Sequence, residues 1–139
     1  MGLDKAVTPR RDVVAGVGFR HATTSEEIVA LVRSGLATAG VPAGRLNALA
    51  TADDRADEIA FRAAAVVLGC ETIGLPPEAL RSVDDRVPTR SVRIEAERGV
   101  GSLAEAAALV GAGERAMLIL PRIASVGATC ALALVFDSE

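Results

Sequence analysis

The sequence predicts a single α/β domain with three layers, α/β/α, around a mixed and mostly parallel sheet of about five strands that ends in an antiparallel hairpin. Short apolar runs alternate with stretches of helical period along most of the chain, which is typical of strand–helix–strand units. The last two apolar runs are joined by a short loop, so those strands must pair antiparallel. The 139 residues suit one core, and half of them are hydrophobic, which argues against a disordered chain.

The first half of the chain alternates strand and helix. Polar and basic residues 1–11 are expected to form a flexible leader, and residues 12–139 the domain. The expected elements are a strand at 13–18, a helix at about 24–39 capped by Gly40, a strand at 46–51, a helix at 55–68 and a short strand at 70–73. The expected buried faces of the two helices are Ile28, Leu31, Val32, Leu36 and Ala39 in the first, and Ile59, Ala63, Val66 and Val67 in the second, with Asp53 and Asp54 as caps.

The second half is less regular. A brief helix is expected at 76–80, and residues 83–100 are interpreted as a loop that leads into a short helix. Ser102 and Glu105 have capping-box spacing and open a helix to about Val110, which is rich enough in alanine to lie very close to a sheet. A strand at 115–120, a loop at 121–126 and a last strand at 127–136 complete the expected elements.

Composition narrows the function classes. The net charge is −3 and aromatics make up 2% of the chain, so the chain has neither the basic stripe nor the aromatic residues for base stacking that nucleic-acid-binding proteins use. We therefore do not expect nucleic-acid binding. No run has the length of a membrane span and the start has no apolar signal core, so we expect a cytoplasmic protein that is not bound to membrane. Cys70 and Cys130 are lone thiols, which we interpret as buried structural cysteines rather than a disulfide or metal pair.

No cofactor or metal motif is complete. The glycine pair Gly16 and Gly18 follows a strand, but the third glycine of a dinucleotide motif would fall at His21. No phosphate-loop or nucleophile-elbow motif is present. Four acidic residues crowd the expected start of the second helix, and we favour interaction with the helix dipole over a metal site; they are Asp53, Asp54, Asp57 and Glu58. We therefore expect no cofactor and no metal.

The segment between the first strand and the first helix is the strongest candidate site. Gly18, Arg20, His21, Thr23 and Thr24 lie at a strand's carboxyl end beside the free N–H groups of a helix start, which favours anion binding. Arginine binds carboxylates through two parallel hydrogen bonds.

Each of these residues also has a simpler interpretation. The pairs Thr23–Glu26 and Thr24–Glu27 have capping-box spacing, and His21 is either a structural hydrogen-bonding residue or a general base. Ser102, at the start of a later helix, and Arg122, at the tip of the final hairpin, are further candidate ligand-binding residues. Their simpler roles are helix capping and an exposed surface cation.

Four motifs together resemble the CobE family of cobalamin biosynthesis proteins, which is homologous to the C-terminal domain of CbiG, the cobalt-precorrin-5A hydrolase of the anaerobic pathway. The motifs are GVGFRHATTSEEI, TADDRADEIAF, GVGSLAEAAAL and LPRIASVGATCALAL, in this order, and the resemblance covers residues 12–135. The chain departs from the family pattern in the first motif, with Phe19 for cysteine, His21 for a second cation, Ala22 for glycine and Thr24 for serine. In the last motif Arg122 keeps one cation and Ala124 replaces another.

The resemblance implies a role in building the corrin ring, with a precorrin or other corrinoid as ligand and other cobalamin-pathway enzymes as further partners. The chain's length leads us to expect the stand-alone form rather than the fused hydrolase. Three hypotheses remain open: an accessory protein that binds a carboxylate-rich precorrin or hydrogenobyrinic acid, a hydrolase that opens a δ-lactone with His21 as base, and a structural partner of other pathway enzymes. We favour the first, in which the protein is not catalytic.

Overall fold

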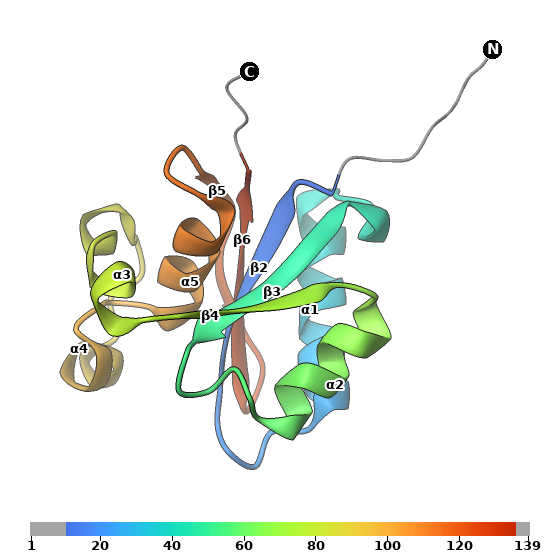
Figure 1. The fold of residues 1–139 in the computed structure, drawn as a ribbon, viewed down its shortest axis with the longest axis horizontal. Coiled ribbons are helices and arrows are strands. Elements are labelled where there is room, and N and C mark those ends of the chain that lie inside the picture. The colour runs from blue at the N-terminus through green and yellow to red at the C-terminus, as the bar shows by residue number, and fades with distance from the viewer. Residues whose placement is uncertain (1–10, 136–139) are drawn as a thin grey trace.

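A five-stranded mixed sheet forms the centre of the protein (Figure 1). The computed structural model describes residues 11–135. The strands are β2 (Val13–Phe19), β3 (Leu46–Ala52), β4 (Glu71–Leu75), β5 (Met117–Ala124) and β6 (Ala128–Leu134), in the order β4-β3-β2-β6-β5. β2, β3 and β4 are parallel, whereas β6 is antiparallel to both β2 and β5. The predicted mixed sheet with a terminal antiparallel hairpin is therefore confirmed.

Helices cover both faces of the sheet, as predicted (Figure 1). One layer consists of α1 (Ser25–Ala39) and α2 (Ile59–Leu68). The other layer is α5 (Leu103–Ala112), with α3 (Pro77–Arg81) and α4 (Val92–Arg98) on the same side. Short 3-10 turns occupy Ala43–Arg45 and Asp84–Arg86. No helix within residues 11–135 is long and apolar enough to cross a membrane.

The two faces of β2 explain why its sequence is so apolar. Val13, Ala15, Val17 and Phe19 contribute to the core under α1 and α2, and Val14 contributes to the core under α5. Gly16 also faces α5: a β-carbon there would lie 2.5 Å from the backbone nitrogen of Ala108, and closer still to the carbonyl oxygen of Ala104. The backbone of α5 thus rests directly on β2, which confirms that the alanine-rich helix packs very close to the sheet.

The predicted start and buried face of α2 were wrong. The helix begins at Ile59 instead of 55, and residues 53–57 form turns before it. The side chains of Ile59, Val66 and Val67 are 86%, 79% and 58% exposed, whereas Phe61, Ala64 and Ala65 are buried. Arg62 is the one polar residue in the helix, so the hydrophobic pattern does not define a face. Phe61 decides the orientation by stacking on Phe19, with ring centroids 5.7 Å apart.

The final hairpin also differs from expectation, because β5 continues to Ala124 through residues predicted to be a loop. Leu120 pairs with Leu132 and Ile123 with Cys130, so Pro121 and Arg122 form an irregularity in the strand. Proline has no N–H to donate, which suits such a position. Arg122 therefore lies within β5, short of the hairpin tip.

Several smaller expectations can be compared with the structure. Of the two cysteines, Cys130 is buried as predicted, and burial raises the pKa of its thiol to about 12; Cys70 is only half-buried, and burial also raises its pKa. β4 spans 71–75 instead of 70–73, and β6 ends at Leu134. The expected leader lies outside the described residues except for Arg11, and so does Phe136.

Candidate functional site

A cleft of about 460 Å³ lies at the carboxyl ends of β2 and β5. Its walls come from the loop after β2, α4, the start of α5, the β5–β6 turn and the loop before α2. Five of the seven residues predicted to bind a ligand line it: Gly18, Arg20, His21, Ser102 and Arg122. The cleft is within the size range of small-molecule pockets, roughly 300–1,000 Å³.

The sheet topology explains why Arg20 and Arg122 meet, although they are far apart in the sequence. β6 lies between β2 and β5 and is antiparallel to both, so β2 and β5 run in the same direction and end at the same edge. The loop after β2 and the β5–β6 turn lie together at the lower edge of the view (Figure 1). They are also directly bonded, because the Arg20 amide donates to the carbonyl of Gly127 at 2.9 Å.

Thr23 and Thr24 are not brought into the cleft. The buried Thr23 hydroxyl donates to the carbonyl of Gly127 at 2.8 Å. Thr24 caps α1 by accepting from the Glu27 amide at 3.1 Å. Both hydroxyls therefore have structural roles, one joining the loop to the hairpin and the other starting the helix.

The two predicted capping boxes are realised only in part. Thr23 does not cap the helix, and Glu27 does not return to the Thr24 amide. Instead the Glu27 carboxylate accepts from the Gly127 amide at 2.6 Å and from the Ser125 hydroxyl. These hydrogen bonds, that from Ser125 first, lower the pKa of Glu27 below its ordinary value of 4.5. Glu27 thus ties the hairpin to α1.

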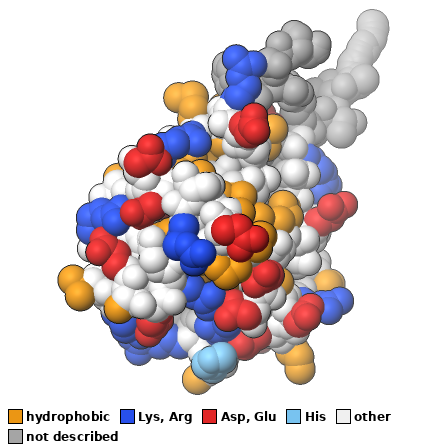
Figure 2. All heavy atoms as spheres, turned by 60° about the vertical axis from the view of Figure 1, so that its left-hand side comes forward, with side chains coloured by type: hydrophobic (Ala, Val, Ile, Leu, Met, Phe, Trp, Pro, Cys, Tyr) orange, Lys and Arg blue, Asp and Glu red, His pale blue; other side chains and the backbone are white. Residues whose placement is uncertain are grey.

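Positive charge dominates the charged groups of the cleft. Five arginines line it, against one carboxylate, Glu97; they are Arg20, Arg55, Arg93, Arg98 and Arg122. Among residues 11–135, the guanidinium groups of Arg20, Arg93 and Arg122 form no salt bridge. Arg98 pairs with Asp54 at 2.8 Å. Figure 2 shows basic side chains gathered at the lower left of one face, with acidic ones between them. The cleft is suited to an anion with several carboxylates.

Arg55 was not among the predicted site residues. Its guanidinium lies 4.4 Å over the ring centre of Phe19, and its Nε donates to Glu58 Oε2 at 2.8 Å. The Arg55 Nη2 nitrogen is buried and has no hydrogen-bond partner within the described chain. A buried, unpartnered donor on a residue that lines a cleft is a candidate ligand contact. Phe19 thus supports Arg55.

Different signals were available for the arginines that sequence reasoning missed. Arg55 follows the carboxyl end of β3, a position equivalent to that of Arg20 after β2, and this rule could have identified it. Arg93 and Arg98 lie on α4, where charges of alternating sign are typical of a solvated helix face. Nothing in their spacing pointed to a cleft.

His21 is held beside a carboxylate. Its Nδ1 lies 3.0 Å from Glu58 Oε2, its side chain is 81% exposed, and it lines the cleft. The same Glu58 oxygen accepts from Arg55. The acidic residues before α2 therefore pair with cations, Glu58 with Arg55 and His21, and Asp54 with Arg98. No group of three or more metal-binding side chains occurs among the described residues.

Comparison with known proteins agrees with this fold. The curated protein CobE from a Sinorhizobium species is 40% identical over 121 residues, which are 87% of this chain and 79% of that protein. The crystal structure of a CobE, described as a protein of the cobalamin (vitamin B12) biosynthetic pathway, is 34% identical and covers 87% of this chain and 91% of that one, with a TM-score of 0.82. The crystal structure of the cobalamin biosynthesis protein chiG from Agrobacterium tumefaciens is 33% identical in sequence and matches 90% of this chain and 99% of that chain, with a TM-score of 0.71.

These likenesses define the class: the protein is one of cobalamin biosynthesis. The family model described as Cobalamin synthesis G C-terminus matches residues 13–133, which is nearly all of the described chain. The chain belongs to this family, and the predicted resemblance to CobE and to the C-terminal domain of CbiG is confirmed.

Proposed function

We propose that the protein binds a carboxylate-rich corrin-ring intermediate, of the precorrin or hydrogenobyrinic acid type, in the arginine-lined cleft and acts in the cytoplasm as an accessory or carrier protein. The observation that carries the proposal is the convergence of Arg20, Arg93 and Arg122, which form no salt bridge within residues 11–135, on one cleft. Guanidinium groups without internal partners remain available to ligand carboxylates.

The geometry indicates how such a ligand would be held. Arg20 lies in the loop after β2 and Arg122 near the carboxyl end of β5, whereas Arg93 and Arg98 lie on α4. Groups on different walls suit a ligand whose carboxylates are distributed around its rim. Ser102 adds a hydroxyl at the start of α5, where the positive end of the helix dipole also favours anions.

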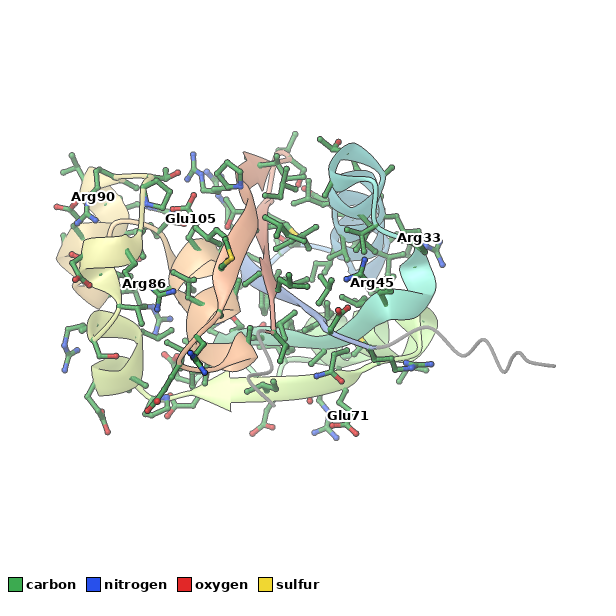
Figure 3. The ribbon with its side chains drawn as sticks, turned by 90° about the horizontal axis from the view of Figure 1, so that it is seen from above. Arg33, Arg45, Glu71, Arg86, Arg90 and Glu105 are labelled. Atoms are coloured by element: carbon green, nitrogen blue, oxygen red, sulfur yellow. The ribbon has the colours of Figure 1, made fainter. Side chains whose placement is uncertain are left out.

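Calorimetric titration with hydrogenobyrinic acid tests this proposal. Arg20→Ala is expected to weaken binding roughly 10- to 100-fold, because one charge-assisted contact contributes about 1.5–3 kcal/mol. The matched control is Arg33→Ala, since Arg33 is an exposed arginine on α1 that does not line the cleft. Figure 3 shows it at the end of the molecule opposite Arg90 and Glu105. No binding by the wild-type protein, or equal affinities of the two variants, would reject the proposed site.

A second candidate function is hydrolysis of a δ-lactone, favoured by the contact between His21 and Glu58. A carboxylate at Nδ1 orients a histidine so that Nε2 can take a proton from water, as in other histidine bases. Water would then add to the lactone carbonyl, the ring C–O bond would break, and the proton would pass to the leaving oxygen. Full support of cobalamin synthesis by His21→Ala in a deletion strain would exclude this role.

The third candidate, a structural partner of other pathway enzymes, is favoured by the exposed face of α2. Ile59, Val66 and Val67 form an apolar surface there, and such surfaces occur at protein contacts. Val66→Lys should then abolish co-purification with purified cobalamin-pathway enzymes and leave hydrogenobyrinic acid affinity unchanged. Unaltered co-purification would exclude this face as the contact.

A further inference from the structure

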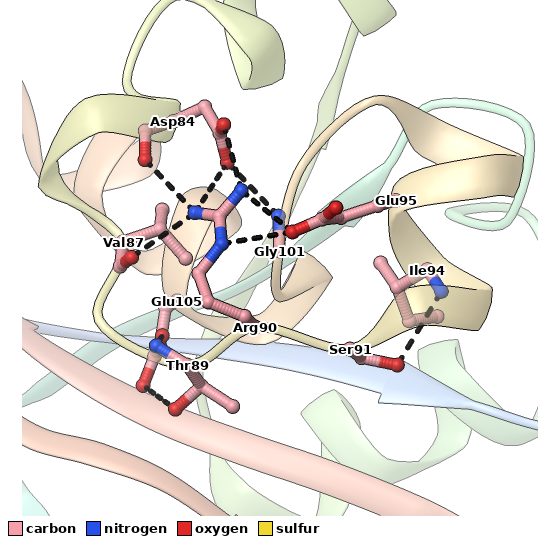
Figure 4. A network of polar contacts seen from close by, with 9 residues as sticks. All are labelled: Asp84, Val87, Thr89, Arg90, Ser91, Ile94, Glu95, Gly101 and Glu105. Atoms are coloured by element: carbon pink, nitrogen blue, oxygen red, sulfur yellow. Dashed lines mark hydrogen bonds and ion pairs between the residues drawn. The ribbon is translucent and has the colours of Figure 1, made fainter.

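Glu105 is a fully buried carboxylate that does not line the cleft. Its Oε1 accepts from the Thr89 amide at 2.9 Å. Its Oε2 accepts from the Thr89 hydroxyl at 2.7 Å and from the Arg122 amide at 2.8 Å. Figure 4 shows the bonds to Thr89, and Figure 3 places Glu105 at the same end of the molecule as Arg86 and Arg90. Burial of a carboxylate is costly, so three donors converging on it stabilise one specific arrangement.

The bonds of Glu105 join three segments, each of which supplies a wall of the cleft. Its own helix, α5, supplies Ser102 and Leu103. Thr89 precedes α4, which supplies Arg93 and Arg98. Arg122 belongs to the irregular stretch of β5, where its amide bonds to Glu105. Glu105 therefore fixes the position of the main chain that carries Arg122 relative to the segment that carries the α4 arginines.

The segment before α4 is held by polar contacts and by the buried side chain of Val87, which packs in the core under α5. Arg90 forms two hydrogen bonds of 3.0 Å with the carboxylate of Asp84 and one of 2.8 Å with Glu95 (Figure 4). The Gly101 amide donates to Asp84 at 2.9 Å. These bonds close the segment on itself, whereas the bonds from Thr89 attach it to Glu105 on α5.

We propose that Glu105 is a positioning residue for the anion-binding cleft and sets the spacing between Arg122 and the arginines of α4. This inference rests on the proposed function. A fixed spacing between cations on two walls selects a ligand with several carboxylates at matching separations over a ligand with one. Glu105 is also the last residue of the predicted Ser102–Glu105 capping box. Its amide donates to the Ser102 hydroxyl at the start of α5, and the proposed role adds a function for its carboxylate in organising the cleft.

Glu105→Gln tests the proposal, since the amide keeps the side-chain shape but replaces one acceptor with a donor. Calorimetric titration with hydrogenobyrinic acid is expected to show at least tenfold weaker binding. The discriminating readout is a double-mutant cycle. Arg122→Ala should cost much less affinity in the Glu105→Gln protein than in the wild type. Arg20→Ala, on the loop after β2, is the matched control and should cost the same in both.

Thr89→Val and Thr89→Ser provide a second test that leaves the buried carboxylate in place, and it decides the matter if Glu105→Gln does not fold. Thr89→Val removes the hydroxyl donor and should weaken binding, and Thr89→Ser should restore it. The positioning role is wrong if Arg122→Ala lowers affinity equally in the wild type and in Glu105→Gln, or if all Thr89 variants bind equally. The proposed function still stands in that case, provided that the wild type binds. If the wild type does not bind, both fall.

Discussion

Replacing Gly16 by alanine should destabilise the protein strongly, because β2 and α5 are in backbone contact at this residue. The new β-carbon would lie 2.5 Å from the Ala108 nitrogen and closer to the Ala104 oxygen. Ordinary contact begins near 3.4 Å, so α5 must move away from the sheet by roughly 1.5 Å to clear the Ala104 oxygen. Overpacking costs about 1–3 kcal/mol, sometimes more, and the reduced freedom of the unfolded chain offsets about 0.5–1 kcal/mol. Because the clash is with backbone atoms, which cannot relax by changing rotamer, the cost should lie at or above the top of that range, and we expect a net loss of roughly 2 kcal/mol or more.

This prediction is checked by urea and thermal unfolding followed by far-ultraviolet circular dichroism, because the chain has no Trp or Tyr for fluorescence. A loss of 2 kcal/mol corresponds to a fall in Tm of about 7 °C for a domain of this length. The control is Gly35→Ala in α1, where the nearest atoms are the flexible ends of Leu120 and Ile123 side chains at 3.2 and 3.4 Å. We expect that control to stay within about 1 kcal/mol of wild type. Wild-type stability of Gly16→Ala would refute the close packing of α5 on β2.

Three further predictions concern stability. Thr24→Ala removes the cap of α1 and should cost about 0.5–2 kcal/mol in urea unfolding, and no loss would show that the cap is dispensable. Hydrogen bonds lower the pKa of Glu27 and of Asp84, so the stabilisation by these ionised carboxylates is present above the unfolded pKa values near 4.5 and 3.8 and is lost as pH falls through the lower folded values. The Tm of the wild type should therefore drop below about pH 4.5, and that of Glu27→Gln should drop less steeply. An equal dependence of Tm on pH in the two proteins would exclude a contribution from Glu27. Ile59→Lys should change the free energy of unfolding by less than about 0.5 kcal/mol, whereas Phe61→Ala should lower it by about 3–5 kcal/mol. A larger loss in Ile59→Lys than in Phe61→Ala would show that the buried face of α2 is the one predicted from the sequence.

The sequence predicted best those elements whose local signals agreed with one another. The first helix has an apolar face, a threonine cap and a terminal glycine, and Gly40 indeed adopts a left-handed φ of 71°. The parallel direction of the first strands followed from the helices between them, and the antiparallel hairpin followed from its short loop. The order of the strands across the sheet, β4-β3-β2-β6-β5, was not predicted. In α2, by contrast, nearly every residue is apolar, so its orientation was decided by the tertiary contact of Phe61 with Phe19.

The candidate site was predictable where a residue follows a strand and unpredictable where charge is organised by tertiary contacts. Arg20 was found because it follows the carboxyl end of β2. Arg122 was found as a cation at the expected hairpin tip, although it lies within β5, and the sheet topology that brings it to the edge of Arg20 was not predicted. Arg93 was missed, because the alternating charges around it look solvated, although Asp84 and Arg90 in fact pair with each other. Glu105 was interpreted as half of a capping box, whereas its carboxylate accepts hydrogen bonds from Thr89 and Arg122, which are 16 and 17 residues away.

The central claim is that the arginines at the carboxyl edge of the sheet bind the carboxylates of a corrin intermediate. A crystal structure of the protein with hydrogenobyrinic acid tests it most directly. We predict that the ligand occupies the cleft, with its carboxylates on Arg20 and Arg122 and on at least one arginine of α4. A ligand bound elsewhere, or in the cleft without contact to these arginines, would contradict the claim.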